Sequence, residues 1–204
     1  MLKAAPVDWR QSRRDSARAA ILAVAWGVVE QEGLAALSLR DLARRAGITT
    51  PTVYAYFASK NDIYDAMFGQ AAEEFALHIA APHRSDDPRD ILTEGLQRFV
   101  EFCLASVPRY QLLFQHVIPG FAPSAESYAP ARRALDSTRD VLARTGITDE
   151  RHLDMWTAVT TGLVSQQIAN DPGGDRWTRL IDDVVAMFLD YCQPPRTSTG
   201  RRRR

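Results

Sequence analysis

Residues 37–60 read LSLRDLARRAGITTPTVYAYFASK, and this stretch decides the fold of the front of the chain. Gly47 suits a tight turn, because glycine adopts positive φ without steric cost. Ala43 is small enough for a second helix to cross closely, and Val53 can face back to a core from that second helix. The stretch therefore predicts two short helices joined by a turn. Taken alone, these three residues also fit a plain helical hairpin within a bundle.

Signals for helix starts stand on both sides of the turn. Ser38 and Ser59 each begin a Ser-x-x-Asp pattern, which is typical of a helix N-terminus. Pro51 fits the first turn of the helix between them, because no amide donor is needed there. We therefore expect a short helix after Ser38, a second short helix that begins around Thr49 or Thr50, and a long helix after Ser59.

The segment before this stretch has the spacing of one face of a helix. Small and apolar residues recur every three or four positions, which predicts a helix from Ser12 to Glu32. Gly33 is expected to end it, because a helix commonly closes on a glycine with positive φ. The residues expected on the inner face are Ala17, Ala20, Ile21, Val24, Ala25, Val28 and Val29.

The rest of the chain also shows helical spacing, and no sustained alternation of apolar and polar residues predicts a strand. We therefore predict an all-α protein. Both cysteines, Cys103 and Cys192, lie in apolar surroundings without metal-ligand spacing, so reduced and buried thiols are expected. Further helices are expected at about 60–80, 88–106, 110–116, 124–145, 149–170 and 174–191.

The composition is that of an ordinary globular protein, with 46% hydrophobic and 25% charged residues and no net charge. Residues 1–70 carry 9 basic and 7 acidic side chains, whereas residues 71–200 carry 12 basic and 18 acidic ones. A mildly basic front suits contact with phosphate. No secretory apolar segment and no uninterrupted apolar run of about 18 residues occurs, so a cytoplasmic protein without a membrane segment is expected.

The sequence contains no motif of an enzyme or of a cofactor site. Its histidines, His78, His83, His116 and His152, lack HExxH-type spacing. No GxSxG, GxGxxG or phosphate-binding loop occurs. We therefore predict that the protein is not an enzyme and that it uses no cofactor and no metal.

Residues 37–60 as a whole are more specific for a protein family than the three residues around the Gly47 turn. With Thr-Val-Tyr at 52–54, Tyr-Phe at 56–57 and Ser-Lys at 59–60, the sequence resembles the DNA-binding domain of the tetracycline-repressor (TetR) family, over roughly residues 14–68. The resemblance implies an all-α protein of about nine helices, with an N-terminal three-helix helix-turn-helix domain and a C-terminal helical domain for ligand binding and dimerisation. The expected division is a flexible arm at 1–11, the helix-turn-helix domain at 12–60, the C-terminal domain at 61–192 and a disordered basic tail at 193–204.

The resemblance also implies a function and a DNA-binding surface. Such proteins typically repress transcription and leave their operator when a small molecule binds. Hydroxyl groups and a lysine at helix N-termini suit phosphate, which supports the roles carried over by position. Tyr56 also fits a partly buried aromatic with a wet hydroxyl. The expected DNA-binding residues are Ser38, Arg40, Thr49, Thr50, Pro51, Thr52, Tyr54, Tyr56 and Lys60.

The second helix of the hairpin holds no Arg, Lys, Asn or Gln, the side chains that make bidentate base contacts. Pro51, Ala55 and the threonine methyl groups suit thymine methyl groups instead. Arg40 is then the best candidate for a guanine contact, with DNA shape supplying further specificity. Other basic residues fit either a phosphate contact or a solvated face, namely Arg10, Arg13, Arg14 and the terminal run Arg201–Arg204.

The C-terminal half contains an aromatic-rich set of residues from several expected helices. Each of them fits simple core packing. As a group they are compatible with an apolar pocket that carries a few polar tips, and the resemblance implies such a pocket for an unknown small apolar or amphipathic ligand. The set is Phe99, Phe102, Cys103, Tyr110, Leu113, Phe114, His116, Val117, Trp156 and Thr160.

The last two long helices are expected to join two copies into a homodimer. Gly162, Ser165 and Ala169 give small residues where two helices could approach closely. Residues 155–162 are similar to a tryptophan–histidine–glycine signature of one C-terminal subgroup, with Thr161 in place of the histidine. A homodimer should read a roughly palindromic double-stranded operator, with recognition helices about 34–36 Å apart.

Two other functions fit the same sequence. One is an all-helical carrier of small molecules, or an enzyme, with a vestigial helix-turn-helix. The other is an activator or a regulator that responds to no ligand, which the sequence does not separate from a repressor. Retardation of DNA from the protein's own promoter region, lost on Tyr54→Ala or Lys60→Ala, would favour the regulator over the carrier.

Overall fold

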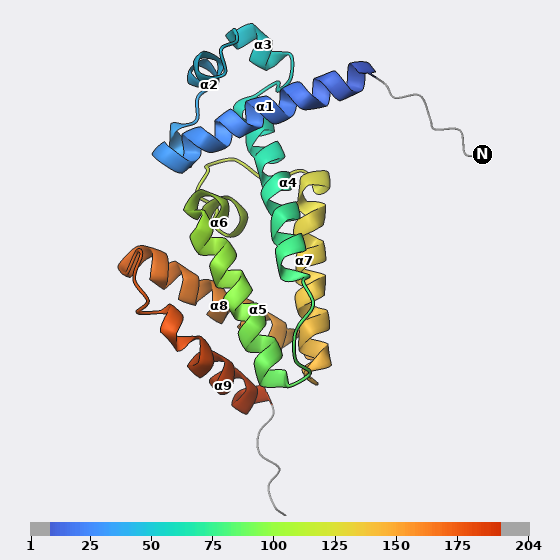
Figure 1. Ribbon diagram of the computed structural model, residues 1–204, viewed down its shortest axis with the longest axis vertical. Helices are drawn as coiled ribbons and strands as arrows, with labels where there is room; N and C mark the ends of the chain where they lie inside the picture. The colour runs from blue at the N-terminus through green and yellow to red at the C-terminus, as the bar shows by residue number, and fades with distance from the viewer. Residues whose placement is uncertain (1–8, 193–204) are drawn as a thin grey trace, which may run out of the picture. The chain divides into compact units, whose positions relative to one another are not determined.

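The computed structural model describes residues 9–192, and within them it contains α-helices, two 3₁₀ turns and no strand, which confirms the all-α prediction (Figure 1). Residues 1–8 of the expected arm and the expected tail at 193–204 lie outside the described residues. No helix in the described part combines the length and the apolar content that crossing a bilayer would require. The elements are α1 Trp9–Glu32, η1 Leu34–Ala36, α2 Leu39–Arg45, α3 Thr50–Tyr54, α4 Lys60–Ile79, α5 Pro88–Ala105, α6 Val107–Phe114, α7 Ala125–Arg144, α8 Glu150–Asn170, η2 Thr178–Leu180 and α9 Ile181–Cys192.

The chain forms two compact units. Unit 1 consists of the residues up to Phe75 together with Ser106–Arg132, and unit 2 consists of Ala76–Ala105 together with the residues from Arg133 onward. The helices α4 and α7 therefore contribute to both units. The boundary at residue 60 that the sequence suggests separates a DNA-binding domain from a ligand-binding domain, and it stays a prediction. The division into compact units is different, because it places α6 and the first part of α7 with the N-terminal helices.

The core of unit 1 is built from α1, the α2–α3 hairpin and the first part of α4, with Leu112 of α6 packed among them. Burying one large apolar side chain contributes about 1.5–3 kcal/mol, so this shared core is what holds the short helices in place. Two glycines with positive φ, Gly33 at 83° and Gly47 at 67°, turn the chain at the ends of α1 and α2, as predicted. The hairpin residues in the core are Leu42, Ala43, Val53 and Phe57.

The first helix differs from its prediction in two respects. It begins at Trp9 rather than Ser12, so residues 9–11 of the expected arm are helical. Ala20 is exposed, although the spacing placed it on the inner face. The reason is that Leu22 and Trp26 are buried as well, which shifts the apolar stripe away from Ala20.

Helix α6 begins earlier than the sequence suggested. The prediction placed it from Tyr110 to His116, whereas the helix spans Val107–Phe114. The Ser106 hydroxyl accepts a hydrogen bond from the Arg109 amide at 3.2 Å and caps the helix, and Pro108 fits its first turn. The residues from 115 to 124 are consequently a loop.

Unit 2 is a helical cluster in which α5, α8 and α9 pack against one another. The prediction of one helix from Gly174 to Tyr191 was wrong at its start, because a loop and η2 precede α9. The buried side chain of Gln167 explains the difference. Its carbonyl oxygen accepts from the amides of Trp177 and Thr178, and its amide donates to the carbonyl oxygen of Gly174. These bonds satisfy backbone groups that a helix would otherwise have to pair.

Candidate nucleic-acid interface

The α2–α3 hairpin is shaped by hydrogen bonds between close neighbours in the sequence. The Ser38 hydroxyl accepts from the Asp41 amide at 3.2 Å, and the Thr49 hydroxyl accepts from the Thr52 amide at 3.3 Å. Each bond satisfies an amide that the first turn of a helix leaves unpaired. Gly47 supplies the turn between the two helices. The predicted helix-turn-helix geometry is therefore present.

The hairpin leaves a polar face in contact with solvent. In Figure 1, α2 and α3 lie on one side of α1 and α6 lies on the other side. The Tyr54 side chain is 52% exposed, which is unusual for a tyrosine that serves only in packing. Of the residues predicted to bind DNA, Ser38, Arg40, Thr49, Pro51 and Tyr54 are exposed, and Thr50, Thr52, Tyr56 and Lys60 are half-buried.

The arginines of α2 differ in how their charge is used. Arg44 and Arg45 both pair with the Asp41 carboxylate, and Arg45 also pairs with Glu32. The hydrogen bond from Arg44, supported by the one from Arg45, lowers the pKa of the Asp41 carboxyl. Within residues 9–192, Arg40 takes part in none of the ion pairs and its side chain is exposed. Its guanidinium is thus available for an external anion or base.

Lys60 begins α4 behind the Ser59 cap, as predicted. The Ser59 hydroxyl accepts from the Asp62 amide at 3.1 Å. The Lys60 ammonium donates to the carbonyl oxygen of Ala35 at 3.4 Å and lies 5.3 Å from the ring centre of Tyr64. Contact with a phosphate would therefore have to replace a weak internal hydrogen bond.

Arg18 supports the hairpin from α1, and the sequence reasoning missed this role. Its guanidinium lies 4.3 Å from the ring centre of Phe57 and donates to the carbonyl oxygen of Tyr56. This contact fixes the end of the segment that carries α3. The partners are separated by 38 residues, so no local pattern could reveal the contact.

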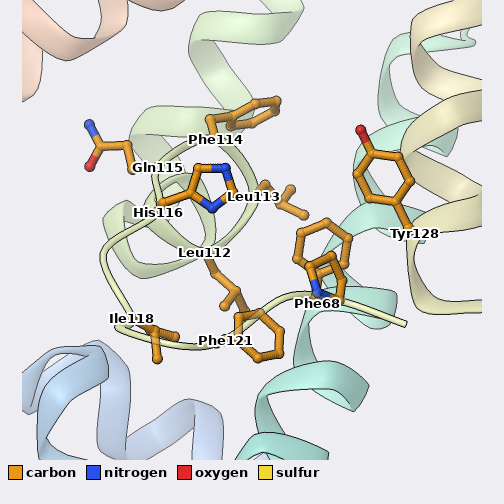
Figure 2. A pocket seen from close by; sticks show the side chains of 10 residues that line it. Phe68, Leu112, Leu113, Phe114, Gln115, His116, Ile118, Phe121 and Tyr128 are labelled. Carbon is orange, nitrogen blue, oxygen red and sulfur yellow. The ribbon is translucent and has the colours of Figure 1, made fainter. Parts of the chain in front are cut away.

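A cleft of about 170 Å³ opens in unit 1 between α4, α6, the loop after α6 and the start of α7 (Figure 2). Phe68 and Leu112 are buried beside it, and His116 and Tyr128 are exposed at its edge. The near-parallel rings of Phe68 and Tyr128 have centres 6.0 Å apart. The full lining is Phe68, Leu112, Leu113, Phe114, Gln115, His116, Ile118, Phe121, Pro123 and Tyr128.

The structure brings only part of the predicted pocket set to this cleft. Leu113, Phe114 and His116 line it, and Tyr110 is buried behind Phe114 with ring centres 5.8 Å apart. Val117 is exposed and does not line it. The other members, Phe99, Phe102, Cys103, Trp156 and Thr160, belong to unit 2.

The unit 2 members of that set have packing partners of their own. Trp156 packs on Phe188 with ring centres 4.8 Å apart, and the Thr160 hydroxyl donates to the carbonyl oxygen of Trp156 at 2.8 Å. Cys103 is fully buried, and burial raises the pKa of its thiol. Among the described residues, no group of three His, Cys, Asp or Glu side chains is placed to hold a metal ion.

Phe68 and Tyr128 are cleft residues that sequence reasoning did not select. Phe68 lies in the helix expected at about 60–80, where helical spacing does not distinguish a cleft residue from a core residue. Ile118 and Phe121 lie in the loop after α6, where the sequence has no helical periodicity from which a buried position could be predicted. The only available signal was the presence of two large apolar residues in a segment expected to be a loop.

A second polar contact network joins α1, α4 and α6 within unit 1. The Arg109 guanidinium lies 4.5 Å from the ring centre of Trp26 and pairs with Glu30 at 3.2 Å and with Glu74 at 3.1 Å. The Trp26 indole in turn donates to the side-chain oxygen of Gln70 at 2.9 Å. These contacts connect α6, next to the cleft, with the helix on which the hairpin packs.

Comparisons with known proteins agree with the hairpin geometry. Residues 21–67 match the model of the family described as bacterial regulatory proteins, tetR family. The regulator EthR of Mycobacterium tuberculosis is 39% identical over 92 residues, which cover 43% of this chain and 42% of EthR. The chain is thus matched over less than half the length of that relative. The transcriptional repressor Rv3405c of the same species is 26% identical over 87% of this chain and 91% of its own length.

Solved structures show that the whole fold is shared. The regulatory protein SCO4313 superposes with a TM-score of 0.74 at 20% identity, over 91% of this chain and 99% of that chain. The regulator FadR from Bacillus subtilis, solved in complex with stearoyl-CoA, superposes with a TM-score of 0.68 at 15% identity, over 84% and 97% of the two chains.

The hairpin, its glycine turn and its capped helices define a helix-turn-helix protein. The particular family is indicated by the match over residues 21–67: this part of the chain, from within α1 to α4, matches the tetR family of bacterial regulatory proteins, and the whole chain shares its all-α fold with solved structures.

Proposed function

We propose that this protein is a DNA-binding transcriptional repressor that leaves its operator when a small molecule binds. The observation that carries the proposal is the exposed face of the α2–α3 hairpin, where Arg40, Pro51 and Tyr54 lie in contact with solvent on a rigid, capped frame. A short helix that enters the major groove needs such a face, because base edges and phosphates are reached by side chains that pack on nothing else. The names of EthR and Rv3405c, a regulator and a repressor, support the same role.

The proposed contacts divide into two kinds. Thr49, Thr50, Thr52, Tyr54 and Lys60 contact phosphates and set the position of the hairpin. These groups are hydroxyls or an ammonium at helix N-termini or on the exposed face, where an anion is favoured.

The remaining contacts read sequence. Arg40 reads a guanine, because it is the exposed cation of α2 without an internal ion pair, and Pro51 meets a thymine methyl group. Ser38 caps α2 and thereby sets the direction from which Arg40 approaches. Tyr56 is half-buried and has its carbonyl oxygen held by Arg18, so it supports the end of the recognition segment.

The repressor acts as a homodimer through α8 and α9. On α8, Ala158, Gly162 and Ala169 are exposed and small, which lets a second helix approach closely. On α9, Met187 is 57% exposed and Tyr191 is 54% exposed, more than solvent contact favours for apolar side chains. A two-fold axis through these helices gives a roughly palindromic operator. Light scattering after size exclusion tests this step, and a monomer at micromolar concentration would contradict it.

Release by a ligand uses α4. This helix carries Lys60 at its start and Phe68 in the wall of the cleft, so a change at the cleft reaches the hairpin through one rigid element. Ligand affinity and DNA affinity must then be coupled reciprocally. Stearoyl-CoA bound to FadR supports a ligand-responsive role for this fold.

The decisive experiment is gel retardation with DNA from the promoter region of the protein's own gene. We expect a specific complex that Tyr54→Ala weakens, with binding that falls as salt rises because phosphate contacts release counterions. A protein that retards no DNA at any salt concentration would contradict the proposal and would favour a small-molecule carrier with a vestigial helix-turn-helix.

The base-reading role of Arg40 has a matched control in the same helix. Arg40→Ala should lower operator affinity by roughly 5- to 150-fold and relax the preference at one base pair, as expected for loss of a bidentate guanine contact of about 1–3 kcal/mol. Arg44→Ala removes an equal charge that is paired with Asp41, and should leave the base preference unchanged. A binding selection that gives the same preferred sequence for Arg40→Ala and wild type would refute the assignment.

A further inference from the structure

We propose that the cleft around Phe68 is the effector site and that it takes a small, uncharged molecule with a single aromatic ring. The inference rests on the proposed function for its regulatory meaning, and it adds the location of the site and the chemical class of the ligand. It is carried by four properties of the cleft: its charge, its size, its aromatic walls and its attachment to α4.

The lining of the cleft contains no Asp, Glu, Lys or Arg side chain. Its walls are apolar, from Phe68, Leu112 and Phe114, and its polar groups are uncharged or weakly basic, from Gln115, His116 and the Tyr128 phenol. A charged ligand would lose its hydration without gaining an ion pair, which costs several kcal/mol. A neutral molecule with one or two hydrogen-bonding groups has no such cost.

The size of the cleft suits a single ring. Its volume is about 170 Å³, and an apolar protein cavity of about 150 Å³ is known to hold benzene. A fatty acyl chain attached to coenzyme A is far larger than this space. The cleft therefore differs in ligand class from FadR, although the folds superpose.

The walls favour a flat partner. The rings of Phe68 and Tyr128 are inclined by only 21° to each other, and Phe114 stands almost at right angles to Phe75 behind it, with 84° between the rings. Aromatic side chains attract a further ring by offset stacking or edge-to-face contact. Figure 2 shows Phe68 and Tyr128 reaching the same space from α4 and α7, with Leu112 and Leu113 of α6 opposite them.

The cleft is attached to α4 by a hydrogen-bonded clamp. The Asp65 carboxylate accepts from the amide and the hydroxyl of Ser124, at 2.6 and 2.9 Å, and from the hydroxyl of Ser127 at 2.8 Å. A Cβ atom on Gly69 would lie 3.3 Å from the Ser127 hydroxyl, so α4 and α7 are in close contact there.

The clamp lies beside the two stacked rings. Phe68 is next to Gly69 on α4, and Tyr128 is next to Ser127 on α7. A ligand that pushes Tyr128 away from Phe68 therefore pulls on the clamp and displaces α4, the helix that Lys60 begins.

The test compares three probes by isothermal titration calorimetry at pH 8. Benzamide and benzoate have nearly the same size and shape but differ in charge, and stearoyl-CoA is large and charged. We expect benzamide to bind with a Kd of about 1 mM or below, benzoate to bind at least roughly tenfold more weakly, and stearoyl-CoA to show no binding that depends on the cleft. Benzoate or stearoyl-CoA binding as tightly as benzamide, or no binding of benzamide, would overturn the proposal.

A blocking variant locates the binding and a matched variant controls for added bulk. Leu113→Trp fills the cleft from its wall, whereas Leu135→Trp adds the same side chain on an exposed part of α7. Benzamide binding should be lost in the first and kept in the second, with circular dichroism and Tm confirming that both fold. His116→Ala, at the exposed edge, should weaken benzamide binding without affecting Tm, so the site remains testable if Leu113→Trp does not fold.

The regulatory half is measured separately on DNA. Saturating benzamide should lower the affinity of the wild type for its promoter DNA at least roughly tenfold, within the usual range of coupling energies, and should leave Leu113→Trp unaffected. DNA binding without any effect of bound benzamide would overturn the effector role while the proposed repressor function stands. Absence of DNA binding would remove both, whereas calorimetry would still decide the ligand class of the cleft.

Discussion

The α2–α3 hairpin and the segment from Ser106 to Tyr128 belong to the same compact unit, yet contacts of very different range hold them. In the hairpin, the caps join residues three positions apart, such as Ser38 with Asp41. In the later segment, Ser106 donates to Glu30 across 76 positions, and Ser124 donates to Asp65 across 59. The hairpin is thus specified largely by its own sequence, whereas the later segment takes its shape from α1 and α4.

The difference in range matters for regulation. The local caps set where α2 and α3 begin, while the shared core and Arg18 hold the hairpin on α1, so the hairpin has few contacts with the segment from Ser106 to Tyr128 that a ligand could alter. Long-range contacts couple separate elements, and a ligand can shift an equilibrium only through contacts that differ between two arrangements. Apart from Phe68 of α4, the residues that line the proposed effector site belong to the segment from Ser106 to Tyr128, next to the clamp on Asp65.

Arg109→Ala should produce the largest loss of stability. The substitution removes the stacking on Trp26 and leaves Glu30 and Glu74 without their shared cation. Because Arg109 is only partly exposed, we expect a loss of about 2 kcal/mol in the free energy of unfolding, below the full value for a buried pair. Urea denaturation measures this loss from the shift of the midpoint.

Arg139→Ala is the matched control for Arg109. Arg139 also pairs with two acids, Asp136 and Glu150, but its side chain is more exposed than that of Arg109. Within residues 9–192, Arg139 does not stack on an aromatic ring. Its loss should be clearly smaller. Equal losses in the free energy of unfolding for the two variants would show that the long-range Arg109 network stabilises the protein no more than an exposed ion-pair network does.

Asp65→Asn should have the second largest effect. An amide offers one acceptor oxygen where the carboxylate offers two, and it points a new donor at two serine hydroxyls. We expect a loss of about 1–2 kcal/mol, since hydrogen bonds to a charged group are worth more than neutral ones but these are partly solvated. Thermal unfolding detects it, with Asp140→Asn on the exposed side of α7 as the control.

If the clamp transmits the effector signal, Asp65→Asn should also reduce the effect of benzamide on DNA binding. If Asp65→Asn leaves both the Tm and the response to benzamide unchanged, the clamp contributes neither to stability nor to regulation.

The hairpin could be predicted from the sequence because its determinants are local. Ser38, Gly47, Thr49 and Pro51 each report a backbone conformation through their own chemistry, and the structure has a cap or a turn at each of these positions. The same holds for Gly33 at the end of α1. The predicted DNA contacts remain a prediction, since the structure supplies their exposure and not their partner.

The cleft could not be predicted, because its lining comes from segments as distant as Phe68 and Tyr128. Aromatic residues in the sequence indicated a pocket in general terms, but spacing alone could not separate Phe114, which lines the cleft, from Trp156, which packs on Phe188. The loop before η2 was missed for the same reason. Gln167 pairs with Trp177 and Thr178 across 10 and 11 positions, and no local propensity encodes such a bond.

Gly47→Ala tests the local nature of the hairpin with a smaller effect. The added Cβ meets no atom within 4 Å, so its cost is the positive φ of 67° alone. We expect a loss of about 1 kcal/mol. Gly27→Ala on the exposed side of α1 also meets no atom within 4 Å, but its φ is not positive, and it should gain about 0.5–1 kcal/mol by raising helix propensity. Opposite signs in Tm support the local view, and two losses would refute it.

The smallest effect is expected from the ion pairs on the exposed face of α2. Arg44 and Arg45 lower the pKa of the Asp41 carboxyl, so its ionised form is favoured more in the folded chain than in the unfolded chain. The carboxylate therefore adds stability above the ordinary aspartate pKa, and this stability is lost as the pH falls below about 4. Asp41→Asn should lower Tm slightly at pH 7 and have no effect once the wild-type carboxyl is protonated. A Tm difference that persists unchanged at low pH would assign the effect of Asp41 to packing or capping rather than to its charge. The α2 ion pairs and the Arg109 network would then differ in the arrangement of their contacts and not in the strength of their charge interactions.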